Sequence, residues 1–193
     1  MRDIERRISM NERFGIPEIV SAGIGTALFV VLTTVQIPIG IPNTYLQPRM
    51  AILAFVAAVF GPTVGAVTGL LGHVLGDAVF YGSVSWSWVV PEAVVGIGIG
   101  IFAFRFAVME GRFVSVGKIV LFNLVQIVAN AAAWILVAPI LDIIIYEEPL
   151  SKVFVQGLFA FLGNIIIIGV LATILLAAYS KAVGGSQELQ KED

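Results

Sequence analysis

The residues best suited to chemistry are ionisable side chains set in apolar sequence. His73 and Asp77 stand four residues apart, a spacing that places both on one face of a helix. A charge inside a membrane-spanning helix costs about 2.5–3.5 kcal/mol on insertion scales, so such a residue faces protein or water and is suspected of function. Two roles fit this pair equally: a structural lock between helices, and a donor and acceptor presented to a polar solute.

A third ionisable residue, Glu92, follows Pro91 near the tryptophans Trp86 and Trp88. Three roles are open to it. It can lie at the membrane interface, pair with Arg49 at the start of another apolar segment, or accept hydrogen bonds from a ligand.

A polar stripe runs along the apolar segment 119–140. Asn123, Gln126, Asn130 and Trp134 are offset by three, four and four residues, so they project from one side of a helix. Amide side chains that bridge helices in a membrane explain the stripe as well as ligand contact does. The two roles are hardest to separate at Asn130 and Trp134.

The elements that carry these residues are hydrophobic helices. Of the 193 residues, 59% are hydrophobic and only 12% are charged, against about 25% charged in soluble domains. Four segments each have the length and apolarity of a membrane-spanning helix: 17–37, 88–106, 119–140 and 153–179. Segment 50–80 is interrupted by Gly61-Pro62, which predicts a hairpin of two helices. The prediction is an all-α integral membrane protein with six transmembrane helices.

The distribution of basic residues gives the orientation. With six spans, every Lys and Arg except Arg49 and Lys152 falls on one side, the side that the positive-inside rule assigns to the cytoplasm. The N- and C-termini are therefore predicted to be cytoplasmic. The expected organisation is a cytoplasmic segment 1–14, a membrane domain 15–183 and a disordered tail 184–193, in a multi-pass protein of the plasma membrane of a prokaryote.

Three connections then lie on the outer side. Connection 38–47 contains Asn43 and Tyr45 in a stiff, Pro- and Gly-rich loop. Connection 81–86 ends at Trp86, which suits either an interfacial aromatic belt or a surface that stacks on a ligand. Connection 141–151 contains Asp142, Glu147 and Glu148, and the simplest interpretation is a solvated acidic loop.

Small residues form a second pattern, in the cytoplasmic half of the first helix. Ala22, Gly23, Thr26 and Ala27 leave that half almost free of side chains, so another helix can approach it closely. Packing within the monomer accounts for most small residues of this kind, including Gly65, Gly69, Gly72 and Gly76. The first-helix cluster is denser than such packing requires.

Several function classes are excluded by the residues available. The chain has no Cys and one His, and no nucleophile with a neighbouring base or phosphate-binding loop can be assembled from it. We therefore expect no enzymatic activity, no metal and no cofactor. No basic run indicates nucleic-acid binding. If the protein takes part in energised transport, another subunit must hydrolyse the nucleotide.

A resemblance to a known family emerges from several motifs. They are 39–44 (IGIPNT), 60–65 (FGPTVG), 69–73 (GLLGH) with Asp77, and 81–88 with its Tyr-Gly-Ser and Trp-Ser-Trp. Together with the first helix they resemble the substrate-binding S component of energy-coupling factor (ECF) transporters, closest to the riboflavin-type group. The resemblance implies capture of a vitamin at the outer face, and association with a membrane T component and two ABC ATPase subunits. It places T-component docking at Ala22, Gly23, Thr26 and Ala27. Related S components bind different vitamins, cobalamin among them.

Two hypotheses follow. The first is a solute-binding subunit, with riboflavin the favoured ligand, whose pocket draws on eight candidates: Asn43, Tyr45, His73, Asp77, Trp86, Glu92, Asn130 and Trp134. The second is an autonomous secondary transporter that uses Asp77 and Glu92 as proton or cation sites.

Overall fold

The computed structural model describes residues 15–192, with side-chain surroundings through Ser186, and shows an all-α protein with one small hairpin of strands. Three apolar helices are 12 to 17 residues long: α2 (Ile16–Leu32), α3 (Arg49–Phe60) and α5 (Trp86–Gly100). Three helical segments are long and apolar enough to cross a membrane: α4 (Pro62–Phe80), Val116–Tyr146 and Leu150–Ser186. A short α6 (Ala103–Phe106) follows α5.

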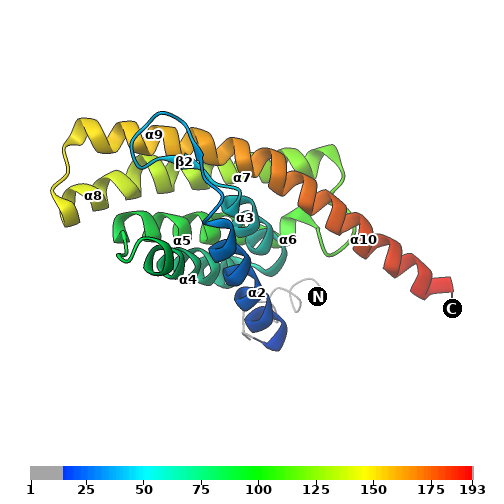
Figure 1. The fold of residues 1–193 in the computed structure, drawn as a ribbon. Coiled ribbons are helices and arrows are strands. Elements are labelled where there is room, and N and C mark those ends of the chain that lie inside the picture. The colour runs from blue at the N-terminus through cyan, green and yellow to red at the C-terminus, as the bar shows by residue number, and fades with distance from the viewer. Residues whose placement is uncertain (1–14, 193) are drawn as a thin grey trace.

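Each of the last two long segments is an α-helix interrupted by a wide turn. The first consists of α7 (Val116–Ala131), the π-helical η1 (Ala132–Val137) and α8 (Ala138–Tyr146). The second consists of α9 (Leu150–Ile167), the π-helical η2 (Ile168–Ala172) and α10 (Thr173–Glu192). Figure 1 shows the α4–α5 and α8–α9 connections at one end of the molecule and α6 with the C-terminus at the other.

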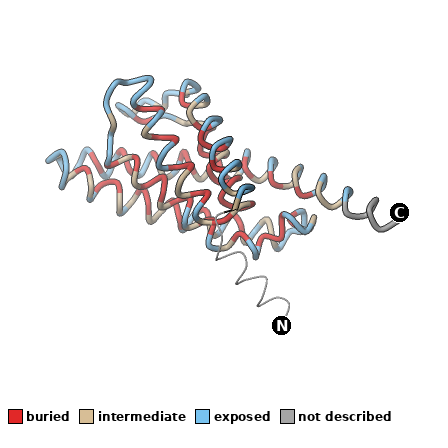
Figure 2. The backbone as a smooth tube through the Cα atoms, turned by 90° about the horizontal axis from the view of Figure 1, so that it is seen from below, coloured by how far each residue is buried: buried red, intermediate tan, exposed pale blue. Residues whose placement is uncertain are grey.

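The helices pack through the faces that carry small side chains. A Cβ built on Gly96 of α5 would lie 2.4 Å from the backbone of Gly65 on α4, so only glycine allows this approach. Further along α4, a Cβ at Gly72 would meet the ring of Phe29 on α2 at 2.6 Å. The predicted role of the α4 glycines in packing within the monomer is confirmed. Figure 2 shows the resulting pattern, with buried residues along the inward side of each helix.

The connection between α2 and α3 crosses the bundle as a two-stranded hairpin. Strand β1 (Ile37–Pro38) pairs antiparallel with β2 (Tyr45–Leu46). The turn between them uses left-handed backbone at Gly40 and at Asn43, a residue type that tolerates this conformation. In Figure 1 this hairpin arches over α9.

Several sequence predictions concern where the helices begin and end. The helical hairpin broken at Gly61-Pro62 is confirmed, because Gly61 has φ of +93° between α3 and α4. The predicted acidic loop is shorter than expected, since α8 continues to Tyr146 and includes Asp142. Helix α10 runs to Glu192 and so contains most of the tail predicted to be disordered from residue 184. The predicted segment 1–14 lies outside the described residues.

Candidate functional site

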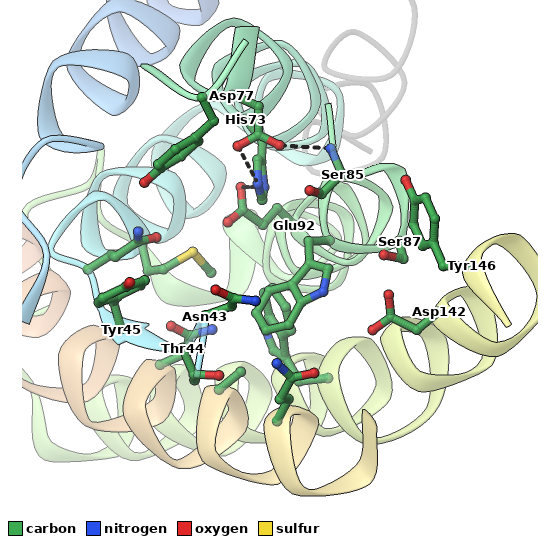
Figure 3. A pocket seen from close by; sticks show the side chains of 18 of the residues that line it. Asn43, Thr44, Tyr45, His73, Asp77, Ser85, Ser87, Glu92, Asp142 and Tyr146 are labelled. Carbon is green, nitrogen blue, oxygen red and sulfur yellow. Dashed lines mark hydrogen bonds and ion pairs between the residues drawn. The ribbon is translucent and has the colours of Figure 1, made fainter. Parts of the chain in front are cut away.

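A cavity of about 390 Å³ opens between the helices on the side of the α4–α5 and α8–α9 connections. Its lining comes from the β1–β2 hairpin and from α3, α4, α5, η1, α8 and α9 (Figure 3). The volume falls within the range of about 300–1,000 Å³ typical of small-molecule sites. The cavity therefore draws together residues that are more than a hundred positions apart in the sequence.

One wall is a cluster of buried charges. The Nη2 atom of Arg49 lies 3.1 Å from Oε1 of Glu92, which is the pairing that the sequence offered as one of three roles for Glu92. Oε2 of Glu92 lies 2.9 Å from Nδ1 of His73, and Nε2 of His73 lies 3.3 Å from Oδ1 of Asp77. All four side chains are at most 6% exposed. A continuous chain of opposite charges thus links α3, α5 and α4.

Neighbouring groups hold this charged cluster in place. Arg49 donates through Nη1 to the Thr33 hydroxyl at 3.2 Å, and its guanidinium lies 4.7 Å from the ring centre of Phe29. The backbone N–H of Ser85 donates to Oδ2 of Asp77 at 2.9 Å (Figure 3). Charge-assisted bonds of this kind fix both ends of the chain of charges. The four side chains are therefore positioned before any ligand arrives.

The cluster is not fully satisfied within the protein. Nδ1 of His73 and Oε2 of Glu92 are buried and close, yet neither makes a hydrogen bond of good geometry. Buried polar groups in such a state carry a free-energy penalty that a partner relieves. Both residues line the cavity, while these two atoms are directed at each other.

An aromatic pair forms a second part of the lining. The ring centres of Trp88 and Trp134 are 5.4 Å apart with planes inclined at 58°. Trp134 is 2% exposed, and its indole N–H has no hydrogen-bond partner. The π-helical turn η1 carries this residue, and π turns are frequent at functional sites. The pair offers apolar surface together with one unused donor.

Asp142 stands beside the aromatic pair, on α8. It is 7% exposed and lines the cavity, with the side chains of Ser87 and Trp88 as its hydrogen-bonding neighbours. Figure 3 shows Asp142 near Ser87. Interpreting this residue as part of a solvated loop was wrong, because α8 extends past it and turns its carboxylate inward. Nearby at the rim, Lys152 Nζ bonds Oε1 of Glu148 at 2.5 Å.

The β1–β2 hairpin closes part of the opening. Gln156 of α9 donates through Nε2 to the carbonyl oxygen of Pro42 at 2.9 Å, which ties the turn of the hairpin to the bundle. Asn43, Thr44 and Tyr45 line the cavity from this side. At the neighbouring edge, Gln36 bonds the hydroxyl of Tyr81, joining the hairpin to the end of α4. The hairpin is thus held to the bundle by two side-chain contacts.

The structure brings together six of the eight residues predicted to bind the solute. Asn43, Tyr45, His73, Asp77, Glu92 and Trp134 line the cavity, and their contact with a ligand remains a prediction. Trp86 is 50% exposed and lies outside the lining, where Trp88 takes the inward position instead. Asn130 is fully buried outside the cavity, and its Nδ2 donates to the backbone oxygen of Gln126.

The remainder of the polar stripe bridges helices. Asn123 donates to the Thr173 hydroxyl at 3.3 Å, and Gln126 donates to the backbone oxygen of Ile165 at 3.3 Å. Of the two roles open to the stripe, amide bridging therefore describes Asn123 and Gln126. Of the stripe, only Trp134, at its C-terminal end, reaches the cavity.

Among the cavity residues that the sequence did not predict to bind solute are three buried polar ones: Ser87, Asp142 and Gln156. A signal for two of them was present. Asp142 continues the four-residue spacing of Asn130 and Trp134, and Gln156 stands eight residues before Asn164 on the same face of its helix. Within residues 15–192, no three His, Cys, Asp or Glu side chains are arranged to hold a metal ion.

The small residues of α2 divide between two surroundings. Ala22 and Thr26 are buried against the bundle. Gly23 and Ala27 are exposed one turn apart, and a Cβ built on Gly23 would have no heavy atom within 4 Å. Two of the four predicted docking residues thus face outward and two face inward.

Comparison with known proteins assigns the chain to a family. Residues 13–181 match the family described as ECF-type riboflavin transporter, S component. A UPF0397 protein of Exiguobacterium sp. is 46% identical over 93% of this chain and 98% of its own length. UPF0397 proteins of Streptococcus gordonii (43%, covering 93% and 96%) and Enterococcus faecalis (42%, covering 95% and 100%) are similar. No solved structure matches. The chain belongs to the family of S components of ECF-type riboflavin transporters, which are transport proteins and not enzymes.

Proposed function

We propose that this protein captures a vitamin or related micronutrient at the outer face of the membrane for an ECF-type importer. The observation that carries the proposal is a cavity in which a buried charged cluster, an aromatic pair and polar loop residues meet. Convergent polar groups on a largely apolar scaffold are typical of small-molecule sites. Membership of the S-component family supports a role of that cavity in uptake.

Riboflavin is the first ligand to test. The family description supports it, as do the two indoles that offer a surface to a flat ring system. A cavity of about 390 Å³ favours a ligand of a few fused rings. Cobalamin, with its corrin macrocycle and nucleotide loop, would need several times this space or would have to protrude, so we rank it below riboflavin.

The proposed partners are the T component and two ABC ATPases, which would supply the energy. The proposed topology has six crossings with both chain ends in the cytoplasm, and the cavity at the outer surface. Gly23 and Ala27 are the proposed contacts for the T component, because they are exposed and small on α2. Close approach of helices at small residues is a common mode of membrane association. Ala22 and Thr26 would support that surface from within.

The direct test is binding by the purified chain alone. We expect riboflavin or another vitamin to bind without ATP, and the protein to copurify with a ligand that mass spectrometry identifies. In liposomes the chain alone should give no flux, and ATP-dependent uptake should appear once T component and ATPases are added. Absence of binding to all vitamins offered, with no copurified ligand, would overturn the proposal.

Gradient-driven flux by the chain alone would favour the alternative of an autonomous secondary transporter. That mechanism needs carboxylates free to exchange protons or cations. Asp77 and Glu92 are instead engaged with His73 and Arg49. The pairing therefore favours substrate capture over ion coupling.

The topology has its own test, aided by the absence of cysteine from the chain. Ser83 is exposed between α4 and α5, and Ser115 is exposed before α7. With six crossings, Ser83→Cys should react with an impermeant maleimide in intact cells, and Ser115→Cys only after permeabilisation. Labelling of both in intact cells would contradict the proposed arrangement.

A further inference from the structure

The carboxylates that line the cavity differ in how their charge is compensated. Glu92 faces Arg49 and His73, Asp77 faces His73, and Glu148 at the rim faces Lys152. Among the described residues, no Lys, Arg or His forms an ion pair with Asp142. Its hydrogen-bonding neighbours Ser87 and Trp88 are neutral, and Lys152, which pairs with Glu148, acts on it only at longer range. Asp142 is therefore the one lining carboxylate, in the part of the chain that the structure describes, that has no Arg, Lys or His in direct contact.

Burial makes this imbalance costly. Only 7% of the surface of Asp142 is exposed. Removing a carboxylate from water without a partner is unfavourable, and a cation or a strong hydrogen-bond donor offsets that cost. The lining contains four carboxylates, which are Asp77, Glu92, Asp142 and Glu148, and two permanent cations, Arg49 and Lys152. With all four ionised, the net charge of the lining is negative whether His73 is neutral or protonated. The cavity as built thus favours a ligand that brings positive charge or N–H donors.

The surroundings of Asp142 indicate what part of a ligand would meet it. Trp88 belongs both to its neighbours and to the aromatic pair with Trp134, whose indole N–H is buried without a partner. The Ser87 hydroxyl is buried beside Asp142, to whose carboxylate it can donate. An acceptor, a buried indole N–H and two ring faces meet in one corner, which is the set of groups that recognises the polar edge of a heterocycle.

We infer that Asp142 anchors a hydrogen-bond-donating nitrogen of a heterocyclic ligand whose ring lies against Trp88 and Trp134, and that positive charge on this nitrogen strengthens binding. The inference rests on the proposed function and specifies the ligand class for the same site. A neutral imide N–H, such as that of an isoalloxazine, meets the requirement. A cationic nitrogen heterocycle meets it better, because its positive charge adds an ion pair with the carboxylate to the attraction that a neutral N–H already has.

The test combines two variants with three probes. Asp142→Asn keeps the shape of the side chain and removes its charge. Glu147→Gln is the matched control, since Glu147 is an exposed carboxylate that follows α8 and does not line the cavity. Riboflavin offers a neutral N–H, and in its N3-methyl derivative that N–H is blocked. Thiamine offers a fixed positive charge. Dissociation constants come from quenching of tryptophan fluorescence.

For the probe that binds best, Asp142→Asn should weaken affinity by roughly 10- to 100-fold, the range for a hydrogen bond to a charged group. Glu147→Gln should change it by less than threefold. If riboflavin binds, the N3-methyl derivative should bind at least tenfold more weakly. Without ligand, Asp142→Asn should unfold at the wild-type temperature or above, since it removes a buried charge. A purely structural role for Asp142 would instead lower that temperature.

Two results would overturn the inference while leaving the proposed function intact. One is an affinity of Asp142→Asn within threefold of wild type for a ligand that the wild type binds. The other is a copurified or best-binding ligand that carries no N–H and no cationic nitrogen. Failure of the wild type to bind any vitamin, by contrast, would overturn the proposed function and this inference with it.

Discussion

Nδ1 of His73 lies 2.9 Å from Oε2 of Glu92, and this contact joins α4 to α5 below the mouth of the cavity. The backbones approach closely there, because a Cβ built on Gly69 would lie 2.7 Å from the carbonyl oxygen of Glu92. Packing of glycines and pairing of charges therefore depend on the same helix contact. Perturbing either should affect both the stability of the bundle and the shape of the site.

Arg49→Met should be strongly destabilising, because it leaves Glu92 buried without its arginine. Loss of one partner of a buried ion pair typically costs about 3–5 kcal/mol. The double variant Arg49→Met, Glu92→Leu should recover most of that loss. Thermal unfolding in detergent, followed by circular dichroism, measures both.

The matched control for that change is Lys152→Gln, at the partly exposed pair with Glu148. Exposed pairs contribute roughly 0–1 kcal/mol, so the unfolding temperature should hardly move. If Arg49→Met and the double variant Arg49→Met, Glu92→Leu were equally stable, the unpaired charge of Glu92 would not be the cause of the destabilisation by Arg49→Met.

Gly96→Ala should destabilise the bundle by about 1–3 kcal/mol, the usual cost of overpacking a tight contact. The added methyl would lie 2.4 Å from the Gly65 backbone, and backbone cannot move aside as a side chain can. Gly117→Ala is the control, since a Cβ there meets no heavy atom within 4 Å. In an open helical position the same change should stabilise by roughly 0.5–1 kcal/mol. A neutral Gly96→Ala would mean that α4 and α5 are less closely packed than described.

Trp134→Phe should weaken ligand binding by about three- to tenfold, since it keeps an aromatic face and removes one hydrogen-bond donor. Trp86→Phe, on a half-exposed residue outside the cavity, should leave affinity unchanged. Fluorescence titration with the identified ligand gives both values. The assignment of Trp134 to the binding site would be withdrawn if the two substitutions had the same effect.

Ala27→Leu should abolish assembly with the T component while leaving vitamin binding intact, because a bulky side chain blocks close approach of a helix at the exposed face of α2. Ala178→Leu, the same change at an exposed position of α10, is the control. Copurification of tagged T component reads out assembly. Normal assembly by Ala27→Leu would place the docking surface elsewhere.

The sequence predicted those features that depend on local patterns. Gly61-Pro62 marked the break between α3 and α4, because proline cannot continue a preceding helix and glycine adopts the φ of +93° required there. The i, i+4 spacing correctly paired His73 with Asp77. The pairing of Glu92 with Arg49 was among the alternatives, since opposite charges in an apolar bundle seek each other.

Features that depend on tertiary packing were not predictable in the same way. Asp142 follows apolar residues and precedes two glutamates, so composition alone placed it in a loop, whereas α8 in fact continues for another turn. Trp86 and Trp88 are two positions apart and therefore point in different directions on a helix. Which of them faces the cavity is decided by how α5 packs against α4 and η1.

The π-helical turn between α7 and α8 also sets the angular phase of the residues after it. Each residue advances an α-helix by about 100°, so removing one from Ala132–Val137 to restore regular α-helix would rotate α8 by about that angle relative to α7. Asp142 would then swing off the inner surface and an aliphatic neighbour would replace it. The number of residues in η1 therefore decides which side chains of α8 line the cavity. An aligned relative with a single-residue deletion there should differ in what it recognises.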